Sequence, residues 1–210
     1  MNEHSPRVSP PVPSTALHAS NLDEASAARE NELLVATDES PTPDARLFAR
    51  LIAAREVRGE IALLGVTQNA LDALFKRHFP NVAKPPRIPA LPATLPASAH
   101  ADFLSALAAL LQTHANPSTN EDDMRCIAAI VAHACLRPDH LWRDLGLSGR
   151  DDVTAMLERY FPTLVIRNTA SLRWKKFLAR ELALARGTEP GPAPGCPGCE
   201  DFGYCFPHGH

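Results

Sequence analysis

Apolar residues recur at helical spacing along most of this chain. In residues 44–57, Leu47, Phe48, Leu51 and Ile52 are one, three or four positions apart, which places them on one face of a helix. The same kind of spacing predicts helices over 60–64, 69–79, 98–114, 121–136, 139–145, 150–160 and 171–186. No segment shows the sustained alternation of a half-buried strand. We therefore predict an all-α fold, an irregular helical domain.

Polar and proline positions predict where these helices begin and end. Asp44 follows Pro43 and is the expected N-cap of the first helix, and Asn120 is the expected N-cap of the helix over 121–136. Gly65 and Pro80 are expected to end the two helices that precede them.

Composition along the chain suggests three regions. Residues 1–43 are rich in Pro, Ser, Ala, Asn and acids, so we expect a disordered segment, in which a short helix near residues 22–34 is compatible but not required. Residues 44–187 form the expected helical domain, interrupted by a proline-rich linker over 80–97. Residues 188–210 form a cysteine-rich tail, which we expect to bind metal.

The overall charge and hydropathy exclude several classes of partner. The chain has 210 residues with a formal net charge of −3, which gives it no general attraction to nucleic acid or to an anionic membrane. No apolar run reaches the roughly 20 residues that a membrane-spanning helix needs. The first residues lack the basic start and apolar stretch of a signal peptide, so we expect a cytoplasmic protein.

Three of the five cysteines lie close together in the tail, at Cys196, Cys199 and Cys205. In a reducing compartment such clustering indicates metal or redox chemistry rather than structural disulfides. The Cys-x2-Cys spacing places two thiolates on one turn, and Cys205 returns after five further residues. Because thiolates are soft donors, zinc, an iron–sulfur cluster and Cu(I) are the candidate metals.

The spacing alone does not choose between two kinds of site. Cys196, Cys199, Cys205 and His208 make a complete Cys3His set for tetrahedral zinc, which would make the chain a zinc-stabilised helical interaction module. The three cysteines equally suit an iron–sulfur cluster. A redox-sensing dithiol of Cys196 and Cys199 is a weaker reading, because a dithiol switch needs no third cysteine.

Four motifs in order resemble the NifQ family. They are HLWRDLGL at 140–147, RN at 167–168, WKKF at 174–177, and AP at 193–194 ahead of Cys196-x2-Cys199-x5-Cys205 and Phe206. The resemblance covers about residues 44–206. It implies a carrier that binds an iron–sulfur cluster of three or four irons together with molybdenum, held by Cys196, Cys199 and Cys205. His208 is a further candidate ligand for the metal.

The same resemblance implies a role and partners in nitrogen fixation. The carrier would supply molybdenum for the iron–molybdenum cofactor of nitrogenase. Its partners would be the NifEN scaffold, the nitrogenase iron protein, and molybdate or another molybdenum donor. One position departs from the family tail, Cys-x4-Cys-x2-Cys-x5-Cys, because Gly191 stands where its first cysteine is expected.

Other candidate residues have simpler readings. Cys126 and Cys135 are expected to be small core residues, with Cys135 the better reserve ligand because His133 and His140 flank it. A basic run near the tail is read as a solvated helix face or as a docking or oxyanion patch; its members are Arg173, Lys175, Lys176 and Arg180. Trp174 is read as a core residue. The chain has no Ser–His–Asp order, paired-carboxylate site, P-loop or GxGxxG fingerprint, so we do not expect an enzyme.

Overall fold

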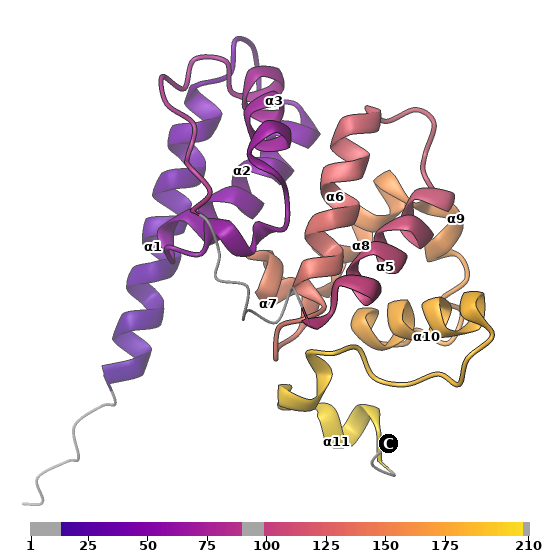
Figure 1. Cartoon of the computed structure of the whole chain (residues 1–210). Coiled ribbons are helices and arrows are strands. Elements are labelled where there is room, and N and C mark those ends of the chain that lie inside the picture. Colours follow the sequence, from indigo (N-terminus) through magenta and orange to yellow (C-terminus); the bar gives the residue numbers. More distant parts are fainter. Residues whose placement is uncertain (1–13, 90–98, 208–210) are drawn as a thin grey trace, which may run out of the picture.

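The molecule is built from packed helices (Figure 1). The computed structural model describes residues 14–89 and 99–207, and within these ranges it contains no β-strand, which confirms the all-α prediction. The elements are α1 (Ser14–Val35), α2 (Pro43–Val57), the 3₁₀ helix η1 (Ile61–Leu64), α3 (Gln68–His78), α5 (Ala101–Thr113), α6 (Glu121–Ala134), α7 (Leu141–Leu145), α8 (Arg150–Tyr160), α9 (Pro162–Val165), α10 (Trp174–Arg186), the 3₁₀ helix η2 (Cys196–Gly198) and α11 (Phe202–Cys205).

Helix α1 departs from the expected disorder of residues 1–43. It runs beside α2 (Figure 1), and Leu33 near its end is fully buried in the core. Arg29 on α1 lies 2.9 Å from Glu56 on α2, and this ion pair ties the two helices together. The expectation does not hold for α1 because Leu33 is part of the core and Leu34 packs against it. Residues 1–13 lie outside the described part.

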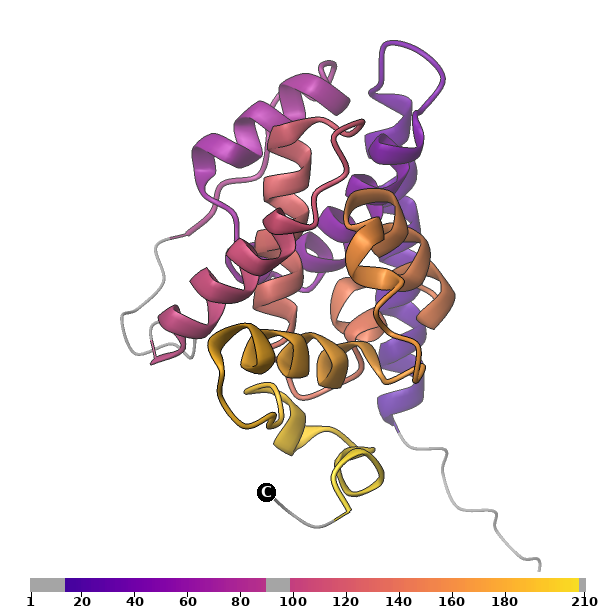
Figure 2. The same cartoon turned by 90° about the vertical axis from the view of Figure 1, so that its right-hand side faces the viewer.

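Helix α6 lies at the centre of the molecule, next to α3, α5, α7 and η1 (Figures 1 and 2). Its apolar side chains Ile127 and Val131 are fully buried. The Asn120 side chain accepts hydrogen bonds from the backbone of Asp122 and Asp123, which confirms the predicted N-cap. The predicted cap of α2 was wrong, because the Thr42 side chain, rather than that of Asp44, accepts the hydrogen bond from Ala45 N.

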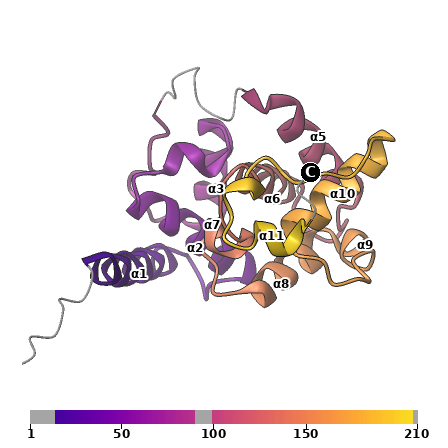
Figure 3. The same ribbon diagram turned by 90° about the horizontal axis from the view of Figure 1, so that it is seen from below.

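The last third of the chain places the tail at one end of the bundle. Helix α10 packs against α5, and the segment after it runs back beneath α7 and α10 (Figure 3). Residues 80–89 of the expected linker contain no helix, and the rest of the linker up to residue 97 lies outside the described residues. No described helix is both long and apolar enough to cross a membrane.

Candidate metal centre

The first half of the tail packs tightly on the turn that follows α6. Gly195 N donates a hydrogen bond to the backbone oxygen of Cys135, at 3.0 Å. A Cβ atom on Gly195 would lie 2.0 Å from the backbone oxygen of Arg137, and one on Gly198 would lie 2.4 Å from Pro138 Cβ. Only glycine allows the two backbones to come this close. Gly195 and Gly198 therefore determine where the neighbouring cysteine side chains lie.

The three tail cysteines line one cavity of about 80 Å³. Cys196 is 7% exposed, Cys199 and Cys205 are half-buried, and all three are free thiols. The wall opposite the tail comes from the start of α7 and of α10, and includes His140, Trp142, Trp174 and Lys175. The structure thus brings the predicted ligands Cys196, Cys199 and Cys205 together, whereas His208 lies outside the described residues.

The cavity surroundings affect the protonation of these thiols. Burial raises the pKa of Cys196, opposed by a backbone hydrogen bond at Ala193 and by the positive charge of Lys175. Burial also raises the pKa of Cys205, opposed by Arg173 and Lys176. The raised pKa values favour the thiol over the thiolate at Cys196 and Cys205, so a metal that binds them displaces protons.

Lys175, which lines the cavity, belongs to a buried ion pair. The Lys175 ammonium contacts the Asp144 carboxylate and donates to the backbone oxygen of Arg137, at 2.8 Å. The Arg137 guanidinium lies 3.2 Å from the same carboxylate. Lys175 is only 6% exposed, so it is part of neither a solvated face nor a docking patch, whereas its reading as part of an oxyanion patch stays a prediction. Trp174 is buried, as predicted.

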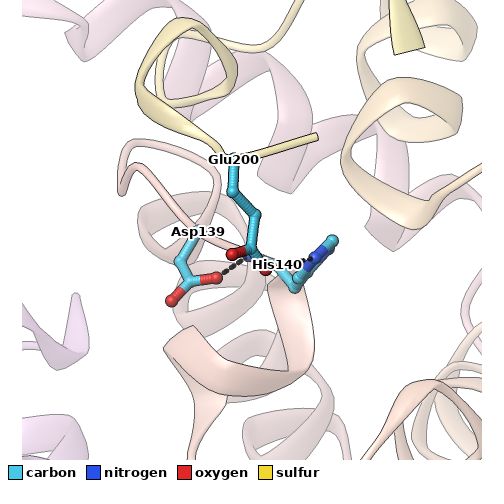
Figure 4. A group of neighbouring side chains, drawn as sticks. All are labelled: Asp139, His140 and Glu200. Atoms are coloured by element: carbon cyan, nitrogen blue, oxygen red, sulfur yellow. Dashed lines mark hydrogen bonds and ion pairs between the residues drawn. The ribbon is translucent and has the colours of Figure 1, made fainter. Parts of the chain in front are cut away.

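The tail segment that follows Cys199 makes charged contacts with the body of the protein. Glu200 lies 2.9 Å from Arg143, and Asp201 lies 2.7 Å from Arg173. The His140 ring nitrogen Nε2 lies 3.4 Å from Glu200 and 3.2 Å from Asp201. Figure 4 shows the Glu200 side chain reaching from the tail toward His140 and its neighbour at the start of α7. The sequence analysis did not find these acids, of which Asp201 pairs with Arg173 of the basic run.

A second group of donor atoms lies beside the cavity. Single donor atoms of Asp139, His140 and Glu200 fall within 4.8 Å of one another (Figure 4), a spacing compatible with one metal ion. However, the Arg143 guanidinium lies 3.2 Å from Asp139 and 2.9 Å from Glu200. This cation already balances both carboxylates and would repel a metal ion. We therefore interpret the group as an ion-pair cluster.

The two remaining cysteines are core residues, as predicted. Cys126 and Cys135 are buried on and just after α6, and burial raises their thiol pKa values to about 11 and about 12. Cys135 is close enough to Cys196 and Lys175 for their charges to affect its pKa, although 61 positions separate it from Cys196. The Cys135 side chain is fully buried, so it does not reach the cavity surface.

Comparison with known proteins gives related sequences. The model of the NifQ family matches residues 45–207, which include the three tail cysteines. A NifQ homolog of Sinorhizobium fredii is 41% identical over 103 residues, 49% of this chain and 44% of that protein. NifQ of Azotobacter vinelandii is 44% identical over 80 residues, 38% of this chain and 41% of that protein. NifQ of Rhodobacter capsulatus is 30% identical over 145 residues, 69% of this chain and 76% of that protein.

The alignments differ in how much of each protein they include. This chain spans less than half of the length of the Sinorhizobium fredii and Azotobacter vinelandii proteins. No solved structure matches the chain. The family model nevertheless matches well over half of the chain, from the second residue after the start of α2 to the end of the described tail. The chain therefore belongs to the NifQ family.

Proposed function

We propose that this protein is an iron–sulfur, molybdenum-binding carrier that supplies molybdenum for the assembly of the iron–molybdenum cofactor in nitrogen fixation. The observation that carries the proposal is the convergence of Cys196, Cys199 and Cys205 on one cavity in a chain of the NifQ family. Thiolates are the usual ligands of iron–sulfur clusters. The bound group would provide soft sulfur ligands for molybdenum, and we propose no catalytic step.

The spacing of Cys196, Cys199 and Cys205 in the sequence suits zinc and an iron–sulfur cluster alike. Membership of the NifQ family is what favours the cluster in this proposal.

The residues around the cavity would have separate roles in binding. Cys196 sits on the part of the tail that is fixed by Gly195, so we assign it the role of the positioned ligand. A cluster held by thiolates is usually negatively charged, and Lys175 places a buried positive charge beside it. The aromatic ring of Trp142 limits access of water from one side.

The family membership suggests where the molybdenum comes from and goes to. We propose that molybdate or another molybdenum donor loads the carrier. We further propose that the loaded protein delivers to the NifEN scaffold together with the nitrogenase iron protein. A test of delivery is to mix loaded carrier with each partner and to measure the molybdenum that co-elutes with the partner.

The proposal is tested by metal analysis of protein purified without oxygen. We expect iron and acid-labile sulfide, a brown colour with visible absorption, and molybdenum uptake when molybdate is supplied. Replacing Cys196, Cys199 or Cys205 by serine should remove the cluster, whereas the control Cys126→Ser should leave it in place, because Cys126 is buried away from the cavity.

One outcome would favour the zinc module instead. Stoichiometric zinc without sulfide, in cells that have ample iron, would contradict the carrier and support a Cys3His site. In that case His208→Ala should remove the zinc, because tetrahedral zinc needs all four ligands.

A further inference from the structure

The cysteine-rich tail is held to the protein in two different ways. The fixed segment, residues 193–198, has its backbone pressed against the turn between α6 and α7, and both Ala193 and Cys196 are buried. The tail loop, residues 199–206, carries Cys199 and Cys205 and is more exposed. The cavity lies between the body of the protein and these two parts of the tail.

The backbone of the tail loop makes few bonds to the body. Among the described residues, its backbone–backbone hydrogen bonds stay within the tail, as in the pair Phe202 N to Cys199 O and the pair Phe206 N to Phe202 O. The Lys176 ammonium reaches from α10 to the backbone oxygen of Cys205 and lies 4.8 Å from the centre of the Phe206 ring. The loop therefore depends on side-chain contacts for its position.

Besides Lys176, two ion pairs and two contacts with a histidine hold the loop through its two acids. Glu200 pairs with Arg143 and Asp201 pairs with Arg173, and both acids lie close to His140, which is charged only when protonated. The three basic residues come from two separate places in the chain, the start of α7 and the residue before α10. Cys199 directly precedes Glu200, and Cys205 lies four residues after Asp201.

We infer that Glu200 and Asp201 are positioning residues that form an electrostatic clasp, closing Cys199 and Cys205 over the cavity by pairing with His140, Arg143 and Arg173. The clasp acts on the ligands and does not itself bind metal. It rests on the proposed function only in treating Cys199 and Cys205 as ligands, while the opening of the loop is a property of the metal-free chain.

The clasp is weak enough to open. The Glu200 side chain is 61% exposed, and Arg143 and Arg173 are each 43% exposed, so water and salt screen these pairs. The fixed segment has no such dependence, because backbone contact and burial hold it. We therefore expect the loop to open while Cys196 stays in place.

The test is the rate of thiol labelling at each cysteine in the metal-free, full-length protein. With maleimide as the probe and mass spectrometry as the readout, Glu200→Gln with Asp201→Asn should speed the labelling of Cys199 and Cys205. We expect about a tenfold effect, the combined size of a few exposed ion pairs. Labelling of Cys196 should change little, and Cys126 and Cys135 report any general unfolding.

A matched control exists elsewhere in the chain. Glu121 and Asp122 are the same two residue types, adjacent and paired with Arg125 on α6. Glu121→Gln with Asp122→Asn should leave the labelling of the tail unchanged. In wild-type protein, raising the salt to about 1 M shortens the Debye length to about 3 Å and should speed labelling of the tail loop in the same way. Because this measurement uses wild-type protein, it does not depend on whether a variant folds.

Exchanging the charges of Arg173 and Asp201 distinguishes a clasp from a general effect on the stability of the fold. Arg173→Asp alone should open the loop, and combining it with Asp201→Arg should restore slow labelling, since the pair is re-formed with reversed signs. Unchanged rates at Cys199 and Cys205 in the double neutral variant would overturn the inference. An equal acceleration at all five cysteines would also overturn it, because the acids would then stabilise the whole domain. Absence of iron and sulfide would contradict the proposed function but would not affect these rates.

Discussion

Replacing Gly195 by alanine would test whether the tail is attached where the structure places it. The added Cβ would lie 2.0 Å from the backbone oxygen of Arg137 and 2.6 Å from its backbone nitrogen and carbon. These are backbone atoms, so they do not move aside as a flexible side chain would. The φ angle of Gly195 is −82°, which alanine adopts without strain, so the clash alone decides the effect.

Two contributions determine the free-energy cost of the Gly195→Ala substitution. Forcing extra atoms into a packed site costs about 1–3 kcal/mol. Moving the tail away also breaks the hydrogen bond from Gly195 N to Cys135 O, which contributes about 0.5–1.5 kcal/mol. Together they give about 2–4 kcal/mol, which shifts the equilibrium between attached and detached tail by roughly 30-fold to several hundred-fold.

Hydrogen exchange and thiol labelling both measure this equilibrium. In Gly195→Ala we expect faster exchange of the residue 195 amide and faster labelling of Cys196, with the helical core intact by circular dichroism. Gly191→Ala is the matched control, because a Cβ there would meet no atom within 4 Å. If Gly195→Ala left Cys196 as protected as in the control, our account of the fixed segment would be refuted.

Three further predictions concern other parts of the molecule. If the proposed cluster forms, Gly191→Cys should increase iron and sulfide in protein purified without oxygen, because it adds the cysteine expected from the family tail where a Cβ meets no atom within 4 Å. Unchanged content would place residue 191 away from the proposed cluster. Burial would raise the Asp44 pKa, but hydrogen bonds from Arg159 and Tyr160 lower it overall. A lowered pKa stabilises the fold above about pH 4, and this stability is lost as pH falls through the folded value. Asp44→Asn should therefore cost under about 1 kcal/mol at pH 7 and less than that at pH 2 in urea unfolding, and an equal cost at both pH values would contradict the assignment. Leu33→Ala should cost about 2–4 kcal/mol, because Leu33 is fully buried, and a cost near zero would show that α1 does not pack.

Local features of the sequence were sufficient to predict most of the helices. The helix over 150–160 was predicted with the bounds that α8 has, and Gly65, at a φ of +87°, follows the short helix that it was expected to end. Such signals act within a few residues, so periodicity and capping reveal them. The clustering of Cys196, Cys199 and Cys205 was predictable for the same reason, since ten residues contain all three.

Contacts between distant segments were not predictable in this way. Helix α1 has little apolar periodicity of its own, and its burial depends on α2. Lys175 lies in a basic run that suggests a solvated surface, yet Asp144, 31 residues earlier, removes it from water. His140 contacts Glu200 of the tail loop, which lies 60 residues later in the sequence. Nothing in the local pattern records which segments pack together, so the sequence shows the donors of the site but not the residues that position them.

The buried carboxylate of Asp144 has a consequence for genetics. It is shared by Lys175 and Arg137, so an allele that removes it leaves Lys175 buried without an ion-pair partner beside the cavity, while Arg137 keeps its contact with Glu60. Under the proposed carrier function, such an allele should lose metal although every cysteine is intact. A screen for alleles that impair nitrogen fixation would then recover Asp144 alongside the cysteines. Its phenotype would not make Asp144 a metal ligand, and a second-site change that neutralises Lys175 is the suppressor to seek.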